Sequence, residues 1–186
     1  MNAVRRRGST LPAPYRIENR QLANGRHVQI RPIAALDAVP IQSSFHLLNE
    51  DEVRKRFLHP IKALGEEHLY QLTHPGPDDA FVVVAAEPLP PGDALIGAAA
   101  RLARDNDDRD RAEFGILVTH FVAGQGLGRV LMQRLFEWCE QHAVRELWGD
   151  VMEDNTPMLR LAAQLGFHRE AILGTPGLIR VTRQFP

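Results

Sequence analysis

The chain has 186 residues and a formal net charge of −1, with 44% hydrophobic and 24% charged residues. This length suits one domain, and the balanced composition excludes a disordered chain. A near-neutral charge gives no indication of binding to nucleic acid or to an anionic membrane surface. No apolar run approaches the about 20 residues that a membrane-spanning helix needs. The single cysteine excludes an internal disulfide framework and a zinc site built from several cysteines.

Residues 1–14 are expected to form a flexible tail, because they carry an arginine cluster and two prolines without any periodicity. Residues 15–186 are predicted to form a single domain. The basic start of the chain at 5–7 lacks the apolar stretch of a secretory signal, so we expect a cytoplasmic protein. The sequence does not indicate the oligomeric state.

The first half of the chain predicts one strand and three helices. Polar and apolar residues alternate from 27 to 33, which predicts a strand limited by Pro32. Asp37 precedes apolar residues at helical spacing, and Asn49 stands three residues before Glu52 in the pattern of a helix capping box. The predicted elements are a strand over 27–33 and helices over 37–48, 49–57 and 65–74.

The second half predicts mostly strands. Two apolar runs, 81–85 and 95–102, flank a loop rich in proline, which predicts a hairpin. The later elements are predicted as a strand over 112–118, a helix after 124–128, a strand over 146–151, a helix over 155–165 and strands over 167–173 and 178–184. This order predicts an α+β fold with a mixed sheet and one parallel strand–helix–strand crossover.

Three alternating glycines, Gly124, Gly126 and Gly128, separate a predicted strand from a strongly amphipathic helix. The first turn of a helix carries N–H groups without intrahelical partners, at the positive end of the helix dipole. Glycine lets a ligand approach this backbone closely, so the turn predicts a site for a phosphate or pyrophosphate. A tight turn without a ligand is the alternative.

Two other phosphate-binding motifs fit this turn poorly. A P-loop needs lysine followed by serine or threonine after the last glycine, where Arg129 and Val130 stand. A Rossmann dinucleotide site needs a glycine at position 129 or 131, and the chain predicts only one strand–helix–strand unit.

Residues 118–130, Val-Thr-His-Phe-Val-Ala-Gly-Gln-Gly-Leu-Gly-Arg-Val, resemble the acetyl-CoA signature of the GNAT N-acetyltransferase superfamily. Gly126 and Gly128 match its glycines, and Ala123 occupies the position of its first glutamine or arginine. A second family block is matched from Asn155 to Phe167, and the blocks and strand order together cover roughly residues 27–175. The resemblance implies a mixed, mostly antiparallel sheet with helices on both faces, and acetyl-CoA as the cosubstrate.

Residues 49–62, 112–114 and 149–159 resemble segments of bacterial protein lysine acetyltransferases. This resemblance implies direct transfer of an acetyl group to the lysine side chain of a protein, for example a metabolic enzyme such as an acyl-CoA synthetase. Two alternatives stay open, a GNAT enzyme that acts on a small amine and a non-catalytic acetyl-CoA sensor. Neither nucleic acid nor a membrane is expected as a partner.

Glu113 is an isolated carboxylate in an apolar strand, one strand before the glycine turn. Burial there would raise its pKa and make it a better base, although a strand glutamate can equally be solvated or paired with Arg101 or Arg111. The position of Glu113 matches the catalytic glutamate of the family. The resemblance therefore implies that Glu113 accepts a proton from the acceptor amine, directly or through water.

The resemblance also implies how the cosubstrate is held. The backbone of Ile116, Leu117 and Val118 would pair with the pantetheine arm, and the N–H of Leu117 would polarise the thioester carbonyl. Asn155 would cap the last helix and hydrogen-bond the pantetheine. The pyrophosphate would be held by the turn formed by Gly124, Gln125, Gly126, Leu127, Gly128, Arg129 and Val130.

Other candidate groups are assigned minor roles. Cys139 lies on the apolar face of the long helix, so we expect a buried thiol rather than a nucleophile. No histidines have a close metal-ligand spacing, so no metal is expected. The acidic stretch 105–110 is expected to be a solvated turn or, alternatively, an acidic rim near the acceptor. Ala162 stands where many family members carry a tyrosine that protonates the leaving thiolate, so we expect water or another group to do so.

Overall fold

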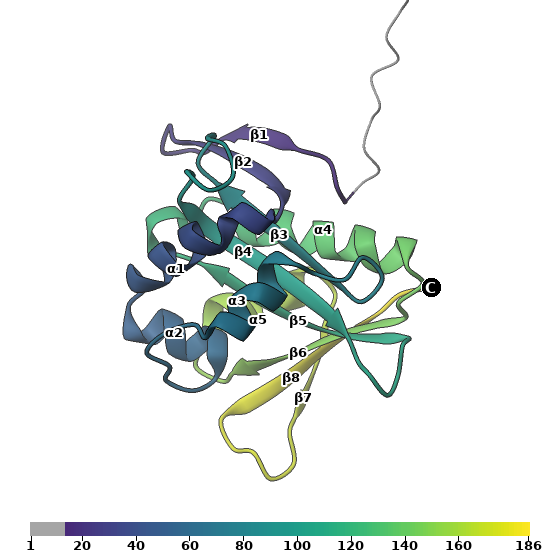
Figure 1. Cartoon of the computed structure of the whole chain (residues 1–186). Helices are drawn as coiled ribbons and strands as arrows, with labels where there is room; N and C mark the ends of the chain where they lie inside the picture. Colours follow the sequence, from purple (N-terminus) through teal and green to yellow (C-terminus); the bar gives the residue numbers. More distant parts are fainter. Residues whose placement is uncertain (1–13) are drawn as a thin grey trace, which may run out of the picture.

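The computed structural model describes residues 14–186, so the tail predicted for 1–14 lies outside the described residues except for Pro14. Its centre is an eight-stranded sheet in the order β1-β2-β3-β4-β5-β6-β8-β7 (Figure 1). Every neighbouring pair is antiparallel except β5 with β6, which is parallel. The strands are β1 (Glu18–Gln21), β2 (His27–Pro32), β3 (Ala80–Ala86), β4 (Ile96–Arg104), β5 (Arg111–Val118), β6 (Glu146–Met152), β7 (His168–Ala171) and β8 (Leu178–Gln184).

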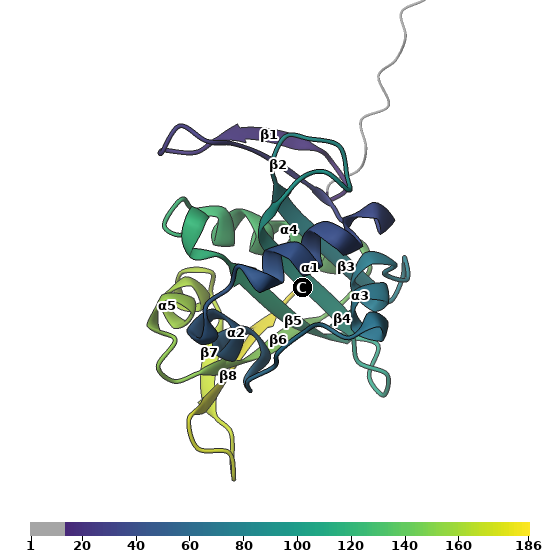
Figure 2. The same cartoon turned by 60° about the vertical axis from the view of Figure 1, so that its left-hand side comes forward.

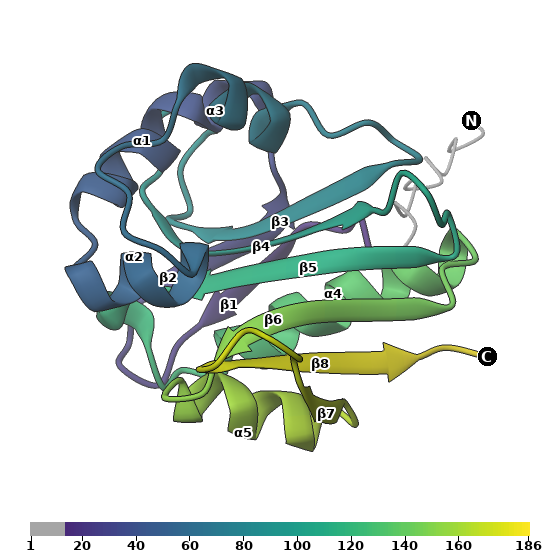
Figure 3. The same ribbon diagram turned by 90° about the horizontal axis from the view of Figure 1, so that it is seen from below.

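Helices cover both faces of this sheet (Figure 3). One face carries α1 (Ala38–His46), α2 (Glu50–Phe57) and α3 (Glu66–Thr73), and the other carries α4 (Leu127–Gln141) and α5 (Thr156–Gln164). The predicted α+β fold is confirmed, with its mixed, mostly antiparallel sheet and one parallel crossover through α4. Across residues 14–186 the structure has no helix of the length and apolarity that a bilayer crossing requires.

The side chains of β4 alternate between these two helical layers. Ala98, Ala100 and Leu102 are fully buried in the core that includes α4, while Ala99 and Arg101 are half-buried on the opposite face. On α4, Cys139 is fully buried as predicted, and burial raises the pKa of its thiol to about 12. The thiol therefore stays protonated at neutral pH and is a packing group.

The hairpin of β1 and β2 at the edge of the sheet contains a strand that was not predicted (Figure 2). The sequence of β1, Glu-Asn-Arg-Gln, has no apolar alternation, so hydrophobic periodicity does not reveal it. Its turn contains Asn24 and Gly25, and Gly25 has a φ of 84°. An Asn-Gly pair is a strong hairpin signal, because these residues tolerate positive φ.

The capping box predicted at Asn49 is confirmed. The Asn49 side chain accepts a hydrogen bond from the N–H of Glu52, and the Glu52 carboxylate accepts one from the N–H of Asn49, both at 2.9 Å. The Glu52 carboxylate also accepts a hydrogen bond from the N–H of His120 at 2.6 Å. This contact holds the first turn of α2 against the segment that follows β5.

A buried ion pair joins the sheet to the layer of α1–α3. Arg31 in β2 donates two hydrogen bonds to the Asp37 carboxylate, at 2.6 and 2.8 Å, just before α1 begins. Asp37 also accepts a hydrogen bond from the N–H of Ala34 at 2.8 Å. Both charged side chains are almost completely buried, so each charge is compensated by the other rather than by water.

We expect Asp37→Ala to lower the free energy of unfolding by about 3–5 kcal/mol, because the Arg31 guanidinium would stay buried without its counter-charge. Urea unfolding followed by circular dichroism measures this change. The control is Asp79→Ala, which removes an exposed ion pair with Arg109 and should cost less than about 1 kcal/mol. Similar losses in the two variants would contradict the prediction.

Candidate active site

The parallel pairing of β5 with β6 ends early. It extends over only three residues, from Arg111 opposite Glu146 to Glu113 opposite Trp148, whereas β5 stays paired with β4 as far as Val118. Along 114–118, the backbone groups that point away from β4 therefore have no strand partner within the described chain. Such an edge can take an extended ligand through added backbone hydrogen bonds.

The ladder between β4 and β5 decides which backbone groups face this open edge. The N–H of Thr119 donates to the carbonyl of Gly97 at 3.0 Å, and hydrogen-bonded pairs recur at every second residue of an antiparallel ladder. This alternation directs the N–H of Leu117 toward β4. The N–H groups of Ile116 and Val118 then point to the open edge.

Gly149 in β6 lies where the two strands separate. A Cβ at this position would lie 2.8 Å from the ring of Phe114 in β5. The Phe114 ring is buried and packs against Phe167, with 5.4 Å between the ring centroids. The ring therefore lies directly on the backbone of β6, and only glycine leaves it room there.

The turn between β5 and α4 has the geometry that the sequence predicts for an anion site. Gly124 and Gly126 have φ values of 74° and 76°, which glycine adopts readily. Gly126 is the N-cap of α4 and provides no side-chain cap, so the N–H groups of the first turn stay available. A Cβ at Gly128 would lie 3.0 Å from the Leu161 side chain, so this glycine allows α4 and α5 to approach closely.

A cleft of about 650 Å³ joins the open edge of β5 to this turn. Two of the predicted site residues do not line the cleft. Gln125 is half-buried, with an Oε1 atom that has no hydrogen-bond partner among residues 14–186, and Val130 packs against the core. The predicted residues that do line the cleft are Glu113, Ile116, Leu117, Val118, Gly124, Gly126, Leu127, Gly128, Arg129 and Asn155.

Two side-chain contacts fix the helices beside the cleft. Asn155 caps α5, because its side-chain oxygen accepts a hydrogen bond from the N–H of Met158 at 3.3 Å. Arg129 on α4 donates to the side chain of Gln164 on α5 at 2.9 Å. The capping role predicted for Asn155 is therefore present, and the same residue also faces the cleft.

Glu113 is exposed to the open cleft and makes no hydrogen bond or ion pair with any residue the structure describes. Arg111, one of its possible partners, instead donates to a glutamate of β6 at 2.8 Å. Desolvation by the cleft walls and the Asp150 carboxylate raise the pKa of Glu113, and Arg101 and Arg56 oppose the rise. The raised pKa makes Glu113 a stronger base than a solvated glutamate.

Two residues that shape the site were not among the predicted site residues. Asp150 in β6 is held by Arg180, whose guanidinium donates two hydrogen bonds to it, each at 2.8 Å. Arg56 lies over Gly115, where a Cβ would be 2.8 Å from the guanidinium carbon. Both residues belong to segments with a recognisable resemblance, but no pattern in the sequence indicates that the segments meet at Glu113.

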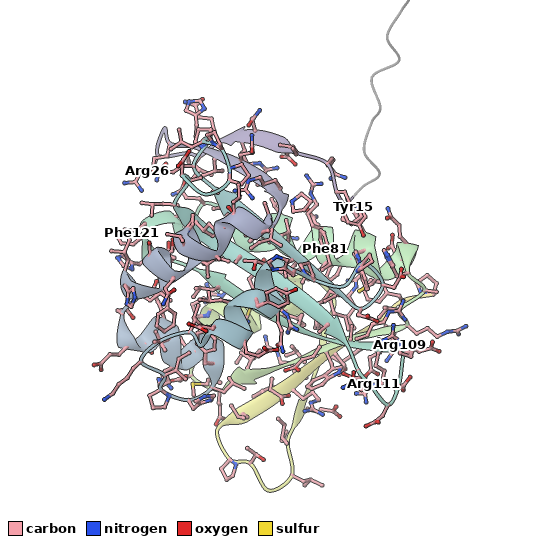
Figure 4. The ribbon with its side chains drawn as sticks, in the orientation of Figure 1. Tyr15, Arg26, Phe81, Arg109, Arg111 and Phe121 are labelled. Atoms are coloured by element: carbon pink, nitrogen blue, oxygen red, sulfur yellow. The ribbon has the colours of Figure 1, made fainter. Side chains whose placement is uncertain are left out.

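The acidic stretch 105–110 does not line the cleft. Figure 4 shows Arg109 and Arg111 at one end of β5, on the opposite side of the molecule from Phe121. Asp105 accepts a hydrogen bond from the indole of Trp148 at 3.1 Å. These contacts favour the turn interpretation over an acidic rim. Among residues 14–186, no group of histidine, cysteine or acidic side chains is arranged to hold a metal ion.

A sequence model of the acetyltransferase (GNAT) family matches residues 45–167. The matched range begins just before α2 and includes β5, the glycine turn and α5. It therefore contains every element that lines the cleft.

Several solved structures share the fold. The GNAT domain of PAT from S. lividans superposes with a TM-score of 0.79 at 19% identity, over 91% of this chain and 97% of that domain. A putative acetyltransferase from Salmonella typhimurium, solved with its cofactor acetyl-CoA, gives 0.64 at 18% identity, over 84% and 93%. A cAMP-binding acyltransferase from Mycobacterium smegmatis gives 0.62 at 21% identity, over 92% of this chain but only 48% of that protein.

We expect Asp150→Asn to lower the pKa of Glu113. The substitution removes a like charge and releases Arg180 from its carboxylate partner, so the ionised form of Glu113 becomes more favourable. Titration of the Glu113 carboxyl carbon by NMR measures the change. Asp105→Asn is the matched control, because Asp105 raises the pKa of Glu113 least and should shift it less. An unchanged or higher pKa in Asp150→Asn would rule out this electrostatic account.

Proposed function

Because the chain belongs to the acetyltransferase (GNAT) family, we propose that it transfers the acetyl group of acetyl-CoA directly to the side-chain amine of a lysine in a protein. The observation that carries the proposal is the position of Glu113. This carboxylate has a raised pKa and no partner in the described chain, and it lies where β5 and β6 separate. A base, an open strand edge and a helix N-terminus thus share one cleft.

The residues of the cleft fit acetyl-CoA. We assign the amides of the pantetheine arm to the backbone of Ile116–Val118 and to the side chain of Asn155, because these groups lie along the open edge and the cleft. We assign the pyrophosphate to the turn of 124–130, whose N–H groups open into the cleft. Ala123 offers no polar side chain, so the backbone carries this contact.

Acetyl-CoA supplies the acetyl group as a thioester, and the acceptor nitrogen replaces sulfur at the carbonyl carbon with loss of a proton. A lysine amine with a pKa of about 10.4 is mostly protonated near neutral pH, and its deprotonation costs roughly 4 kcal/mol. Glu113 accepts this proton, directly or through a water molecule. Its exposure to the open cleft leaves the lysine side chain a path from solvent.

The developing charge on the carbonyl oxygen needs a backbone N–H donor. The N–H groups of Ile116 and Val118 face the open edge in the observed ladder, and we propose one of them as this donor. Leu117 stays a prediction for the same role. The N–H of Leu117 can reach the open edge only if Leu117 no longer pairs with Ala99 of β4.

Water is proposed to protonate the leaving thiolate. Ala162 is fully buried and carries no polar group. Neither tyrosine of the chain lines the cleft, because Tyr15 packs on Phe81 and Tyr70 stacks on His74. The thiol of coenzyme A is a good enough leaving group for transfer without a tyrosine.

Two features support a protein lysine as the acceptor. Residues 49–62, which resemble protein lysine acetyltransferases, form α2 and the segment after it, and α2 lines the cleft beside Glu113. Asp51 and Asp150 form ion pairs with Lys55 and Arg180, and the Glu52 carboxylate accepts hydrogen bonds from the N–H groups of Asn49 and His120. Glu113 is therefore the carboxylate of the cleft that is left without a partner in the described chain and can attract a lysine ammonium. A cytoplasmic location stays a prediction.

We expect Glu113→Gln to lower kcat/KM on a lysine-rich protein by about 100-fold or more, since an amide cannot act as a general base. In the unmodified protein kcat/KM should rise with pH through the raised pKa of Glu113, because only the ionised carboxylate accepts a proton. This acidic limb should be absent in the variant. Release of the coenzyme A thiol measures both effects, and Glu140→Gln, at an exposed position on α4, is the control.

Each other outcome of this experiment contradicts part of the proposal. Equal rates in Glu113→Gln and the unmodified protein would eliminate Glu113 as the base. Turnover on small amines alone would replace the protein acceptor with a small molecule. Tight binding of acetyl-CoA without thiol release on any acceptor would contradict catalysis.

We expect Gly126→Ala to weaken the binding of coenzyme A by about tenfold, because the added methyl group stands at the assigned pyrophosphate site and strains the turn at positive φ by about 1–2 kcal/mol. Gly174→Ala is the matched control, since Gly174 has a φ of 79° and, like Gly126, no atom within 4 Å of an added Cβ. Both variants should lose similar stability in thermal unfolding. Isothermal titration calorimetry should show weaker binding of coenzyme A in Gly126→Ala only. Equal affinities of the two variants for coenzyme A would argue against the assigned site.

A further inference from the structure

A second cavity, of about 70 Å³, lies beside the cleft between the sheet and the layer of α1–α3. Its walls are mostly apolar side chains of these helices and of β4. Ala99 in β4 also lines the cavity, and its small side chain leaves space between the sheet and the helices. The cavity and the cleft share Arg56, Gly115 and Leu117. It therefore adjoins the part of β5 to which we assign the thioester end of acyl-CoA.

Four polar side chains line this cavity without a partner in the described chain. Arg56 and Arg101 make no hydrogen bond or ion pair with any of residues 14–186, and the Nε atom of Arg101 is buried. The Nε2 atom of His68 and the hydroxyl of Thr119 are likewise buried without a partner. Buried polar groups are almost always hydrogen-bonded, so these three buried atoms and the unpaired guanidinium of Arg56 leave hydrogen-bonding capacity for a polar ligand.

The charges around this cavity favour the binding of an anion. Burial, together with the nearby charge of Arg101, lowers the pKa of Arg56 to about 10, although the Glu113 carboxylate opposes the fall. Burial also lowers the pKa of Arg101, and burial with both arginines lowers that of His68, so the imidazole is neutral near pH 7. Two guanidinium cations thus face the single free carboxylate of Glu113, which leaves one positive charge uncompensated. A guanidinium pairs best with a carboxylate, through two parallel hydrogen bonds.

We propose that this cavity binds an acyl chain that ends in a carboxylate, such as the succinyl group of succinyl-CoA, and that Arg56, Arg101 and His68 hold that carboxylate. The inference rests on the proposed function, because it places the thioester along 116–118. It extends that function from the acetyl group to dicarboxylic acyl groups.

An acyl chain fits the cavity better than an acceptor does. The apolar walls suit methylene groups, and a chain attached to the thioester would meet the Arg56 guanidinium, which lies over Gly115 where the cleft and the cavity adjoin. A lysine on a protein reaches Glu113 through the open cleft and cannot carry its backbone under α1–α3. The uncompensated charge also disfavours an ammonium group in this cavity and favours a carboxylate.

The transfer balances in the same way as acetyl transfer. The lysine nitrogen forms a C–N bond to the acyl carbon, and the thioester C–S bond breaks. The lysine ammonium loses two protons in all, one of them through Glu113; the sulfur gains one through water, so coenzyme A leaves as a thiol and one proton is released to solvent. The product is an amide that carries a carboxylate where the lysine carried a cation.

The test compares the binding of succinyl-CoA and butyryl-CoA by isothermal titration calorimetry in the absence of an acceptor. The two acyl groups both have four carbons, but one ends in a carboxylate and the other in a methyl group. We expect the unmodified protein to bind succinyl-CoA about 10–100-fold more tightly, as hydrogen bonds to a charged group allow. Arg101→Gln and Arg56→Gln should each remove most of this preference. Arg26→Gln, in the turn between β1 and β2 (Figure 4), should retain it.

The outcomes separate this inference from the proposed function. Equal affinities of the unmodified protein for the two thioesters would overturn the inference, whatever the arginine variants do. A preference that persists in both Arg101→Gln and Arg56→Gln would overturn it as well. A third outcome would also overturn the inference. If the protein binds succinyl-CoA no more tightly than butyryl-CoA, while KM for a carboxylate-bearing amine rises in Arg101→Gln, the cavity binds the acceptor instead. A succinyl preference without acetyl turnover on any amine would support the inference and contradict the acetyltransferase proposal.

Discussion

The separation of β5 from β6 after Glu113 is the constraint on which the rest of the candidate site depends. A continued parallel ladder would use the backbone of 114–118 in hydrogen bonds within the sheet and leave no edge for a ligand. The ring of Phe114, which lies on the backbone of β6 at Gly149, is incompatible with any side chain at that position. Because β5 then leads into the glycine turn, the same separation brings the open edge, the carboxylate and the N-terminus of α4 into one cleft.

The electrostatic balance at Glu113 connects this cleft to the neighbouring cavity. Asp150, held on β6 by Arg180, raises the pKa of the carboxylate, whereas Arg56 and Arg101 on the other side lower it. The two arginines therefore have a double effect, since they moderate the strength of the base and line the cavity proposed for the acyl carboxylate. An anion bound there would weaken their effect on Glu113 and make it more basic. The identity of the acyl group and the strength of the base are thus physically linked.

Most of the fold could be predicted from local patterns in the sequence. The alternation in β2 and the amphipathic spacing in α4 follow from which side chains must leave water, and the capping box at Asn49 depends on residues three positions apart. The strand β1 was not predicted, because it lies at the edge of the sheet and carries no apolar pattern. The place of β8 between β6 and β7 is not visible in the sequence either, because it depends on pairing between distant segments.

The sequence by itself determined the glycine turn, the isolated carboxylate of Glu113 and the family blocks, because each is a property of neighbouring residues. Only the tertiary structure decided that Arg56, Arg101 and Asp150 converge on Glu113, since they come from α2, β4 and β6 and meet through the order of the sheet and the placement of α2. It likewise decided that the N–H of Leu117 turns toward β4 while those of Ile116 and Val118 face the cleft. Coulomb interactions and desolvation depend on distance through space, and backbone direction depends on ladder register. Neither quantity is encoded in the spacing of residues along the chain.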